Sequence, residues 1–230
     1  MRVFVAGSTG ATGVVLVPLL EARGHTAVPH VRPATATRHP MGAHPNAAVL
    51  ELDDTPSLRA ALRGCDAVVS LIGTMRSRFA AGDTYATSDI GTTRTLVDAA
   101  RGAEVSRFVL LSSLWADSGA GAYLRAKADA ERIVRESGLS WTVVRPSALV
   151  SPADGAEGSH GRRRTPGWLV GAGAVFARLP LVGGWIDDVR AIPIEVVAHG
   201  IAQDLAVSAA FGSGRILHGR DLWASRPAED

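Results

Sequence analysis

Three glycines behind the first apolar segment constrain this chain more than any other feature. Residues 3–6 read Val-Phe-Val-Ala, and Gly7, Gly10 and Gly13 follow before an apolar helical pattern begins. A strand that enters a glycine turn and then a helix gathers free backbone N–H groups at the positive end of the helix dipole. Gly7 permits the sharp turn, Gly10 leaves room for a phosphate, and Gly13 lets the helix pack on the strand. The sequence therefore begins with a predicted pyrophosphate-binding turn.

This turn supplies the first part of the predicted cofactor site. Its spacing is G-x-x-G-x-x-G rather than the commoner G-x-G-x-x-G, so the prediction depends on the strand before it and the helix after it. The alternative is a tight strand-to-helix turn that binds nothing. The residues expected to contact the cofactor here are Gly7, Ser8, Thr9, Gly10, Ala11, Thr12 and Gly13.

Strand and helix patterns alternate along most of the chain. Short apolar runs, which suit strands buried on both faces, are expected at residues 3–6, 27–31, 47–52, 67–72, 108–111, 141–144 and 192–194. Helical patterns are expected at residues 14–22, after the capping residue Asp54, and at 90–100, 123–136 and 196–206. This order predicts an α/β fold with a doubly wound parallel Rossmann sheet and a small C-terminal substrate-binding region. We expect a single domain over residues 1–230.

The overall composition disfavours several classes of partner. Of 230 residues, 24 are Lys or Arg and 22 are Asp or Glu, which gives a formal net charge of +2. Such a small charge disfavours nucleic acid as the main partner. The lone Cys65 excludes an internal disulfide and fits a reducing cytoplasm. No signal peptide precedes the first strand, and no metal-ligand spacing is evident, so we expect a cytoplasmic protein without a metal. The sequence leaves open whether the protein forms an oligomer.

The residue after the second strand indicates which dinucleotide binds. An acidic residue there would accept hydrogen bonds from the ribose of NAD, but Val31 is followed by Arg32. A guanidinium pairs well with a 2′-phosphate, so NADP is favoured over NAD. Alternatively, Arg32 only starts a solvated loop. Pro33 is expected to keep the chain extended there, which is compatible with both interpretations. Glu51 and Leu52, at the end of the third strand, are expected to border the adenine.

A serine, a tyrosine and a lysine form the candidate catalytic set. The fifth strand ends in Ser112 and Ser113, and Tyr123 precedes Lys127 by four residues on a predicted helix. That spacing places the phenol and the ammonium on one helix face. An ammonium beside a phenol favours the phenolate, and a serine hydroxyl can bond to the same substrate oxygen. The alternative is that the helix is exposed and that the tyrosine and lysine are ordinary surface residues.

Several segments together resemble the short-chain dehydrogenase/reductase superfamily in its extended or atypical branch. They are GSTGATG at residues 7–13, LLSS at 110–113, YLRAKADAE at 123–131, SGLSWTVVRPSAL at 137–149 and AIPIEVVA at 191–198. The block over residues 123–149 is especially similar to atypical members. These include the nucleotide-binding accessory subunit of respiratory complex I and the nitrogen-repression regulator (NmrA-like) group.

The resemblance implies a role for each matching position. Ser113 would be the active-site hydroxyl, with Ser112 as the alternative, Tyr123 the acid–base group and Lys127 its partner. Asp89 stands where many extended members carry the Asn that helps to hold a relay water. Gly73, Pro146 and Ser147 would border the cofactor. From their positions after the fifth and fourth strands, Trp115 and Met75 are expected to contact the substrate; the alternative for Trp115 is a packing role.

The amino-acid composition of the chain changes after residue 150. Residues 151–166 are rich in Gly, Ser, Pro and charge and include three arginines at 162–164, which form either a solvated loop or an anion clamp. Residues 167–185 are apolar but contain Arg178 and Pro180, so a lid, pocket wall or subunit contact is expected rather than a membrane span. Residues 151–190 are therefore the predicted substrate-binding or lid region.

Three functions fit these patterns. The first is an NADPH-dependent reductase of a small, largely apolar carbonyl substrate that uses Ser113, Tyr123 and Lys127. The second is a non-catalytic NADP-binding sensor or accessory subunit in which Tyr123 is idle. The third is a redox-neutral epimerase or dehydratase that retains its cofactor. The small region after residue 150 disfavours a sugar-nucleotide substrate.

Overall fold

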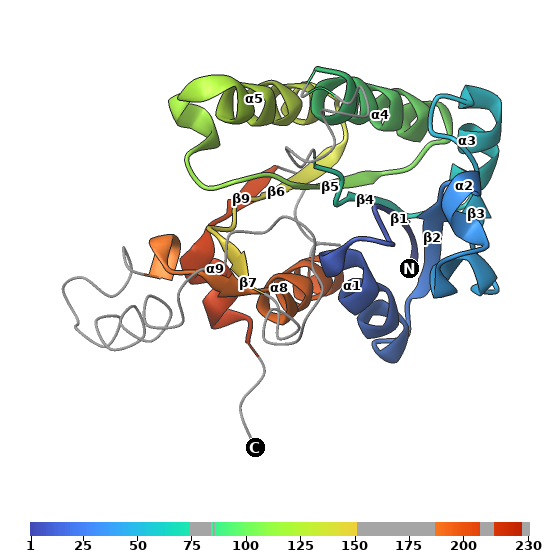
Figure 1. Ribbon diagram of the computed structural model, residues 1–230, viewed down its shortest axis with the longest axis horizontal. Coiled ribbons are helices and arrows are strands. Elements are labelled where there is room, and N and C mark those ends of the chain that lie inside the picture. The colour runs from blue at the N-terminus through green and yellow to red at the C-terminus, as the bar shows by residue number, and fades with distance from the viewer. Residues whose placement is uncertain (74–83, 85, 151–186, 208–213, 227–230) are drawn as a thin grey trace.

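The computed structural model describes residues 1–73, 84, 86–150, 187–207 and 214–226. In these residues, seven parallel strands form one central sheet in the order β3-β2-β1-β4-β5-β6-β9 (Figure 1). The strands are β1 Arg2–Ala6, β2 Thr26–Val31, β3 Ala48–Val49, β4 Ala67–Ser70, β5 Arg107–Leu111, β6 Ser140–Val144 and β9 Arg215–Leu217. The predicted doubly wound α/β fold is confirmed.

The strand order places a crevice beside the glycine turn. The chain runs outward from β1 through β2 to β3 and then returns to β4 on the other side of β1. At such a reversal the connections leave the two central strands in opposite directions, so a ligand can enter at their carboxyl ends. Ala6 pairs with Ser70 in the β1–β4 register, and Gly7 and Leu71 follow immediately.

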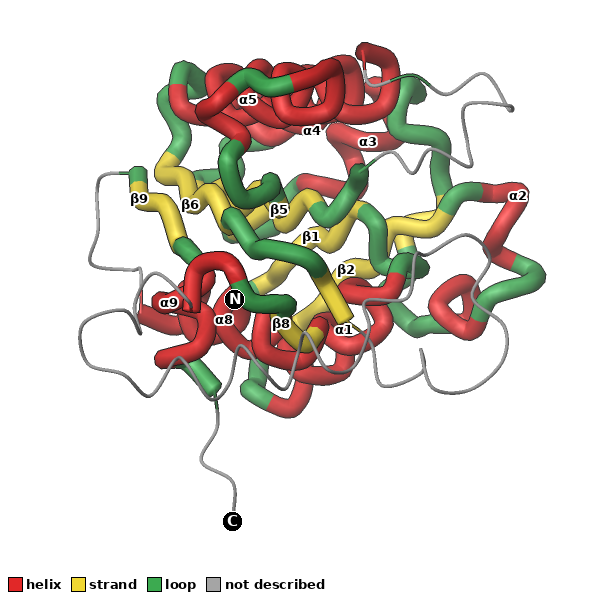
Figure 2. Tube along the Cα trace, turned by 60° about the vertical axis from the view of Figure 1, so that its left-hand side comes forward, coloured by secondary structure: helices red, strands yellow, loops and turns green. Residues whose placement is uncertain are grey.

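Helices cover both faces of the sheet. Helices α3 Thr55–Leu62, α4 Thr92–Gly102 and α5 Gly121–Arg135 lie on one face, and α1 Ala11–Ala22, α8 Ile194–Val207 and α9 Gly219–Ala224 lie on the other (Figures 1 and 2). Shorter elements are α2 Pro33–Ala36, the 3₁₀ turns η1 Pro40–Ala43 and η4 Ala116–Ser118, and the π-helical turn η3 Ala86–Gly91. A separate two-stranded sheet pairs β7 Leu149–Val150 with β8 Ile192–Pro193.

Two hydrophobic cores follow from the alternation of side chains along the strands. In β1, Val3 and Val5 pack into the core beneath α1 and α8, and Phe4 and Ala6 pack into the core beneath α3, α4 and α5. All four side chains are fully buried. Since successive residues of a strand point to opposite faces, an uninterrupted apolar run is what a sheet covered on both sides requires.

Some observed elements differ from the predicted ones. The third strand is shorter than residues 47–52 and comprises Ala48–Val49. The expected strand at residues 192–194 is β8, which pairs with β7 outside the main sheet. The sequence reasoning missed β7, β9 and α9. The extended loop expected at Pro33 is wrong, because Pro33 begins the one-turn helix α2, where its fixed φ suits the first helical position.

Candidate functional site

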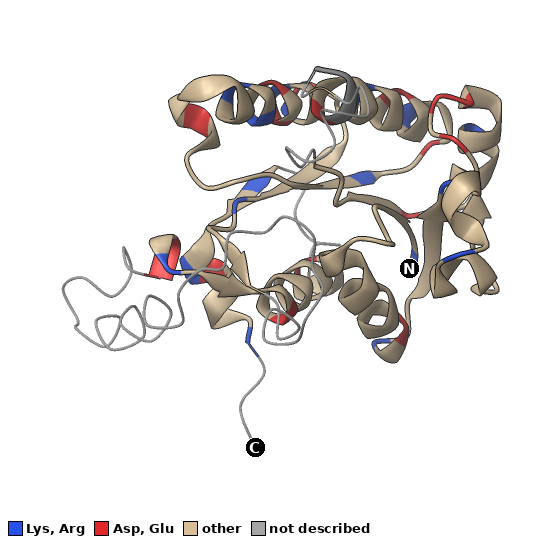
Figure 3. Ribbon diagram, in the orientation of Figure 1, with Lys and Arg blue, Asp and Glu red and all other residues tan. Residues whose placement is uncertain are grey.

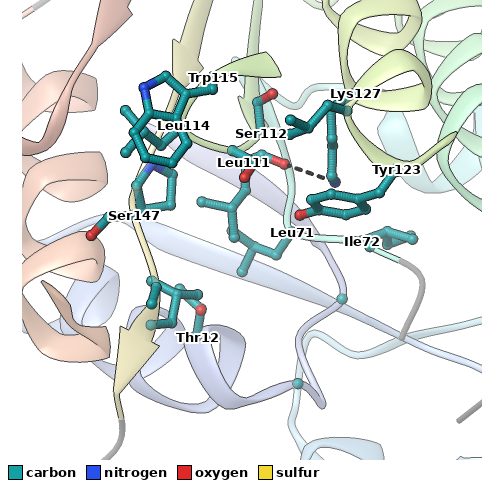
Figure 4. A pocket seen from close by; sticks show the side chains of 18 of the residues that line it. Thr12, Leu71, Ile72, Leu111, Ser112, Leu114, Trp115, Tyr123, Lys127 and Ser147 are labelled. Carbon is teal, nitrogen blue, oxygen red and sulfur yellow. Dashed lines mark hydrogen bonds between the residues drawn. The ribbon is translucent and has the colours of Figure 1, made fainter. Parts of the chain in front are cut away.

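A cavity of about 930 Å³ opens at the carboxyl ends of the central strands. Its walls come from the glycine turn, from the ends of β4, β5 and β6, and from the first half of α5. The lining residues described are Gly7, residues 10–13, 71–73, 111–115, 120–124, Lys127, residues 146–149 and Val189. One continuous cavity therefore joins the predicted phosphate turn to the predicted catalytic set (Figure 4).

The glycines of the turn have the geometry that their sequence positions require. Gly7 has a positive φ of +87°, and a Cβ there would lie 3.2 Å from the Leu71 backbone. A Cβ on Gly13 would lie 2.4 Å from the Gly7 carbonyl oxygen, so a side chain at this position would push α1 away from the turn. Gly10 is exposed toward the cavity and caps the N-terminus of α1.

The N-terminus of α1 is left free to meet an anion. No acidic side chain lies in its first turn, and no side chain caps it. Figure 3 shows α1 without charged residues except near its C-terminal end, whereas charges of both signs line α4 and α5. The helix dipole is therefore unopposed where α1 faces the cavity.

Ser8 fastens the glycine turn to the neighbouring strand instead of facing the cavity. Its fully buried hydroxyl donates to the carbonyl oxygen of His30 at 2.6 Å. The His30 ring lies 3.0 Å, through Nε2, from the Leu50 carbonyl oxygen, and burial lowers the pKa of this histidine. Thr9, half-buried, also lies outside the cavity lining. These contacts fix the turn relative to the carboxyl ends of β2 and β3.

The residues predicted at the adenosine end lie away from the cavity lining. Arg32 is exposed at the N-cap of α2, directly after β2. Glu51 is exposed and Leu52 half-buried beyond β3. None of the three lines the cavity described above. They lie at the ends of the neighbouring strands β2 and β3, and their contacts with the cofactor stay predictions.

Ser113, Tyr123 and Lys127 all line the cavity. Ser113 follows β5 and is half-buried, and Tyr123 on α5 is 37 % exposed. Lys127 lies one turn farther along α5, with Nζ 5.9 Å from the centre of the Tyr123 ring. Figure 4 shows the tyrosine ring directed into the cavity and the lysine chain descending beside it toward Leu111.

The Lys127 ammonium is buried and ion-paired. Nζ lies 2.8 Å from Oδ1 of Asp89, and the side chains of the two residues are 5 % and 1 % exposed. Nζ also donates to the Leu111 carbonyl oxygen at 3.4 Å. A Cβ on Gly73 would lie 3.3 Å from Nζ, so Gly73 leaves the space that the ammonium occupies. The lysine thus holds α5 to β5 and to the π-helical turn η3 as well as facing the cavity.

A second buried ion network fixes the walls of the cavity. Arg145, at the end of β6, makes a bidentate contact with Glu131 of α5, with Nε–Oε1 at 2.9 Å and Nη2–Oε2 at 2.7 Å. Its Nη1 donates to Asp117 of η4 at 2.9 Å, and this hydrogen bond lowers the Asp117 pKa. Ser112 donates to Glu131 Oε1 at 2.6 Å. The Ser112 hydroxyl is therefore engaged by the network, and the hydroxyl at Ser113 is the better candidate.

The sequence reasoning did not identify the role of this network. Glu131 and Arg145 both lie within the family-like segments, which was the available signal, but nothing in their spacing predicts that they pair. Directly after Arg145, Pro146 is buried, and Ser147 donates through Oγ to the Arg190 carbonyl oxygen. Pro146 and Ser147 both line the cavity, as predicted for neighbours of the cofactor.

Trp115 lines the cavity rim and is 58 % exposed. Met75 and residues 151–186, which include most of the predicted lid, lie outside the described residues. Within the described ranges, no cluster of three or more His, Cys, Asp or Glu could hold a metal ion. No helix among those residues has both the length and the apolar character that a membrane span needs.

The cavity fits a pyridine dinucleotide. The uncapped start of α1 would hold the pyrophosphate, since residues 10–13 line the cavity there and no side chain caps the helix. The remaining cavity, with Ser113 and Tyr123 on its walls, would take the nicotinamide end. No acidic side chain lines the described part of this cavity.

Comparisons with known proteins agree with this geometry. Residues 7–167 match the model of a family described as NAD(P)H-binding. An uncharacterised chloroplast protein of Arabidopsis thaliana is 31% identical over 166 residues, which are 64% of this chain and 59% of that protein. The uncharacterised sugar epimerase YhfK of Bacillus subtilis is 29% identical over 157 residues, 65% of this chain and 72% of that protein. The chain thus spans less than two thirds of the Arabidopsis relative.

A solved structure gives the same fold. A short-chain dehydrogenase/reductase superfamily protein from Agrobacterium tumefaciens, solved with bound NAD, has a TM-score of 0.69 at 20% identity, covering 95% of this chain and 77% of that one. This likeness supports the fold, and the family match supports the chemistry of the glycine turn. The chain therefore belongs to the NAD(P)H-binding family and has the fold of a short-chain dehydrogenase/reductase, as its sequence predicted.

Proposed function

We propose that this protein is an NADPH-dependent reductase of a small, largely apolar carbonyl compound. The observation that carries the proposal is the single cavity that joins the glycine turn to Ser113, Tyr123 and Lys127. Gly7 and residues 10–13, with Gly73, Pro146 and Ser147, would hold the dinucleotide, and Trp115 would contact the substrate.

The catalytic proposal assigns one task to each polar group of the cavity. When bound, the reduced nicotinamide supplies a hydride to the carbonyl carbon. The Tyr123 hydroxyl donates a proton to the carbonyl oxygen, and the Ser113 hydroxyl donates a hydrogen bond to the same oxygen. Lys127, ion-paired with Asp89, would favour the phenolate form of Tyr123 and hold the nicotinamide ribose.

The test of this assignment is Tyr123→Phe. Removing the hydroxyl removes the proton donor, so kcat for NADPH-dependent carbonyl reduction is expected to fall by about 10²- to 10⁴-fold. The dissociation constant for NADPH should stay within about twofold, because the phenyl ring still fills its place. Unchanged turnover on every carbonyl that the parent protein reduces would show that Tyr123 is not the acid.

The preference for NADPH over NADH depends on Arg32. Its position after β2, with no acidic residue in its place, supports recognition of a 2′-phosphate. Arg32→Gln should weaken NADPH binding by about tenfold, the loss of one charge-assisted contact, and leave NADH binding nearly unchanged. Equal losses of affinity for NADPH and NADH would show that Arg32 does not discriminate between the two dinucleotides.

One observation favours a second candidate, a non-catalytic dinucleotide-binding sensor. The Lys127 ammonium is ion-paired with Asp89, and Asp89 offers no neutral amide where the extended members carry Asn. A protein that binds NADPH tightly, turns over no carbonyl and copurifies with a stable partner would support the sensor. Carbonyl turnover that Tyr123→Phe abolishes would exclude it.

A further inference from the structure

Trp115 combines a strained backbone with an exposed aromatic ring. Its φ of +59° lies in the left-handed region, and the described residues contain one other non-glycine residue of this kind, Glu104 at +58°. A bulky side chain in this region is uncommon, and strained residues gather at ligand-binding sites. Burial does not explain the strain at Trp115, since the residue is 58 % exposed.

The loop around Trp115 is pinned on both sides, which keeps the ring at the cavity rim. The Trp115 carbonyl oxygen accepts from the Ser118 hydroxyl at 2.7 Å and from the Ser118 backbone N–H at 3.0 Å. The N–H of Leu114 donates to the Pro146 carbonyl oxygen at 2.8 Å. Asp117, two residues on, is held by Arg145. These contacts fix the backbone of the loop without using the indole. The ring is therefore held at the cavity rim although the loop does not need it in order to fold.

The rest of the described substrate wall is uncharged. Lys127 is the one charged side chain among the cavity residues that the structure describes, and it is buried against Asp89. Apolar side chains of Leu71, Ile72 and Leu114 make up much of the wall. Figure 4 shows Trp115 and Tyr123 on different sides of the cavity, with leucine side chains between them.

We propose that Trp115 is a stacking platform, and that the substrate is an uncharged, planar, conjugated carbonyl compound. The proposal rests on the proposed function, whose substrate site it specifies. An indole face attracts a flat π-system more than a saturated ring of equal size, because offset stacking adds to the burial of apolar surface. A carbonyl conjugated to that π-system would extend from Trp115 toward Tyr123.

The same wall disfavours a nucleoside diphosphate sugar as the substrate. A diphosphate carries two or more negative charges, which need backbone N–H groups or cationic side chains as partners. In the proposed function the uncapped start of α1 is already taken by the pyrophosphate of the dinucleotide, so a second diphosphate would depend on cationic side chains. The described cavity offers no cation for this purpose beyond the paired Lys127. Binding of a charged sugar nucleotide more tightly than a neutral planar ketone would overturn the proposal.

The test measures binding by calorimetry in the presence of saturating NADP⁺, so that no turnover occurs. The probes are acetylnaphthalene, its saturated analogue acetyldecalin and UDP-glucose. The parent protein should bind acetylnaphthalene about tenfold more tightly than acetyldecalin, and bind UDP-glucose more weakly than either. Trp115→Leu should remove the preference for the planar ketone, and Trp115→Phe should retain most of it.

A matched control separates stacking from backbone effects. Glu104 has nearly the same φ at the end of α4 and does not line the cavity, so Glu104→Leu changes a strained residue without touching the ligand. It should leave all three affinities unchanged. Circular dichroism and the NADP⁺ dissociation constant check that each variant is folded.

The outcomes distinguish this proposal from the proposed function. Equal affinity of the parent for the planar and saturated ketones, or equal losses for both in Trp115→Leu, overturns the platform. Trp115-dependent selectivity without any NADPH turnover supports the platform and refutes the reductase. Tyr123-dependent turnover whose substrate preference ignores Trp115 supports the reductase and refutes the platform.

Discussion

The buried ion pair between Asp89 and Lys127 should contribute several kcal/mol to the attachment of α5. Its 2.8 Å distance and 1–5 % side-chain exposure place both charges out of water. With an effective dielectric constant of about 20, Coulomb attraction at this distance is about 6 kcal/mol, from which desolvation of both groups subtracts. Removing one partner leaves the other buried without its counter-charge, which typically costs about 3–5 kcal/mol.

A double-mutant cycle isolates the interaction. Asp89→Ala and Lys127→Met should each lower the free energy of unfolding by about 3–5 kcal/mol, as an unpaired buried charge would. The double variant has no stranded charge, so it should lose less than the sum, with a coupling energy of about 3 kcal/mol. Urea unfolding followed by circular dichroism gives all four free energies.

An exposed pair on the same helix provides the control. Arg132 lies 3.0 Å from Asp129, but their side chains are 58 % and 45 % exposed. Solvent screening and side-chain entropy should reduce the coupling there to about 0.5 kcal/mol or less. If the Asp89–Lys127 coupling were as small as that of Asp129–Arg132, the ammonium would be solvated, and its proposed role in fixing α5 would be wrong.

Three further predictions concern the turn, a helix end and a buried histidine. Gly13→Ala should abolish NADPH binding and lower the free energy of unfolding by about 2 kcal/mol or more, because its Cβ would lie 2.4 Å from the Gly7 carbonyl oxygen. Calorimetry would measure the binding and urea unfolding the stability, and retained NADPH binding would contradict the packing argument. Glu104→Gly should raise stability by about 0.5–1 kcal/mol, since glycine adopts its φ of +58° without strain; a lower melting temperature would argue against strain there. Burial lowers the His30 pKa, so the unfolded chain binds more protons below the ordinary value of 6.5, and the unfolding free energy should fall as pH drops through that value. His30→Gln should flatten this dependence, and an unaltered slope would show that other groups cause it.

Backbone-level features of this protein were predictable because they depend on local pattern. The apolar run ending at Gly7 gives β1 and the turn. The tyrosine-lysine spacing predicted one helix face for the two side chains, and both residues lie on α5 and line the cavity. The short strands β7 and β9 were missed because two or three residues carry no measurable alternation. Each forms because another strand of the same chain pairs with it: β6 at the sheet edge pairs with β9, and β8 pairs with β7. Sequence periodicity does not encode such pairings.

Side-chain partners were harder to predict because their choice depends on the assembled fold. Asp89 was expected at the position of a relay amide, and only the packing of η3 against α5 shows its carboxylate on Lys127. Arg145 likewise could have faced solvent, but the end of β6 brings it to Glu131. Both ion pairs have one partner on α5, the helix that carries Tyr123. The same helix therefore presents the phenol to the cavity on one turn and is fixed by buried charges on the next two, so its register relative to β5 determines where the phenol lies.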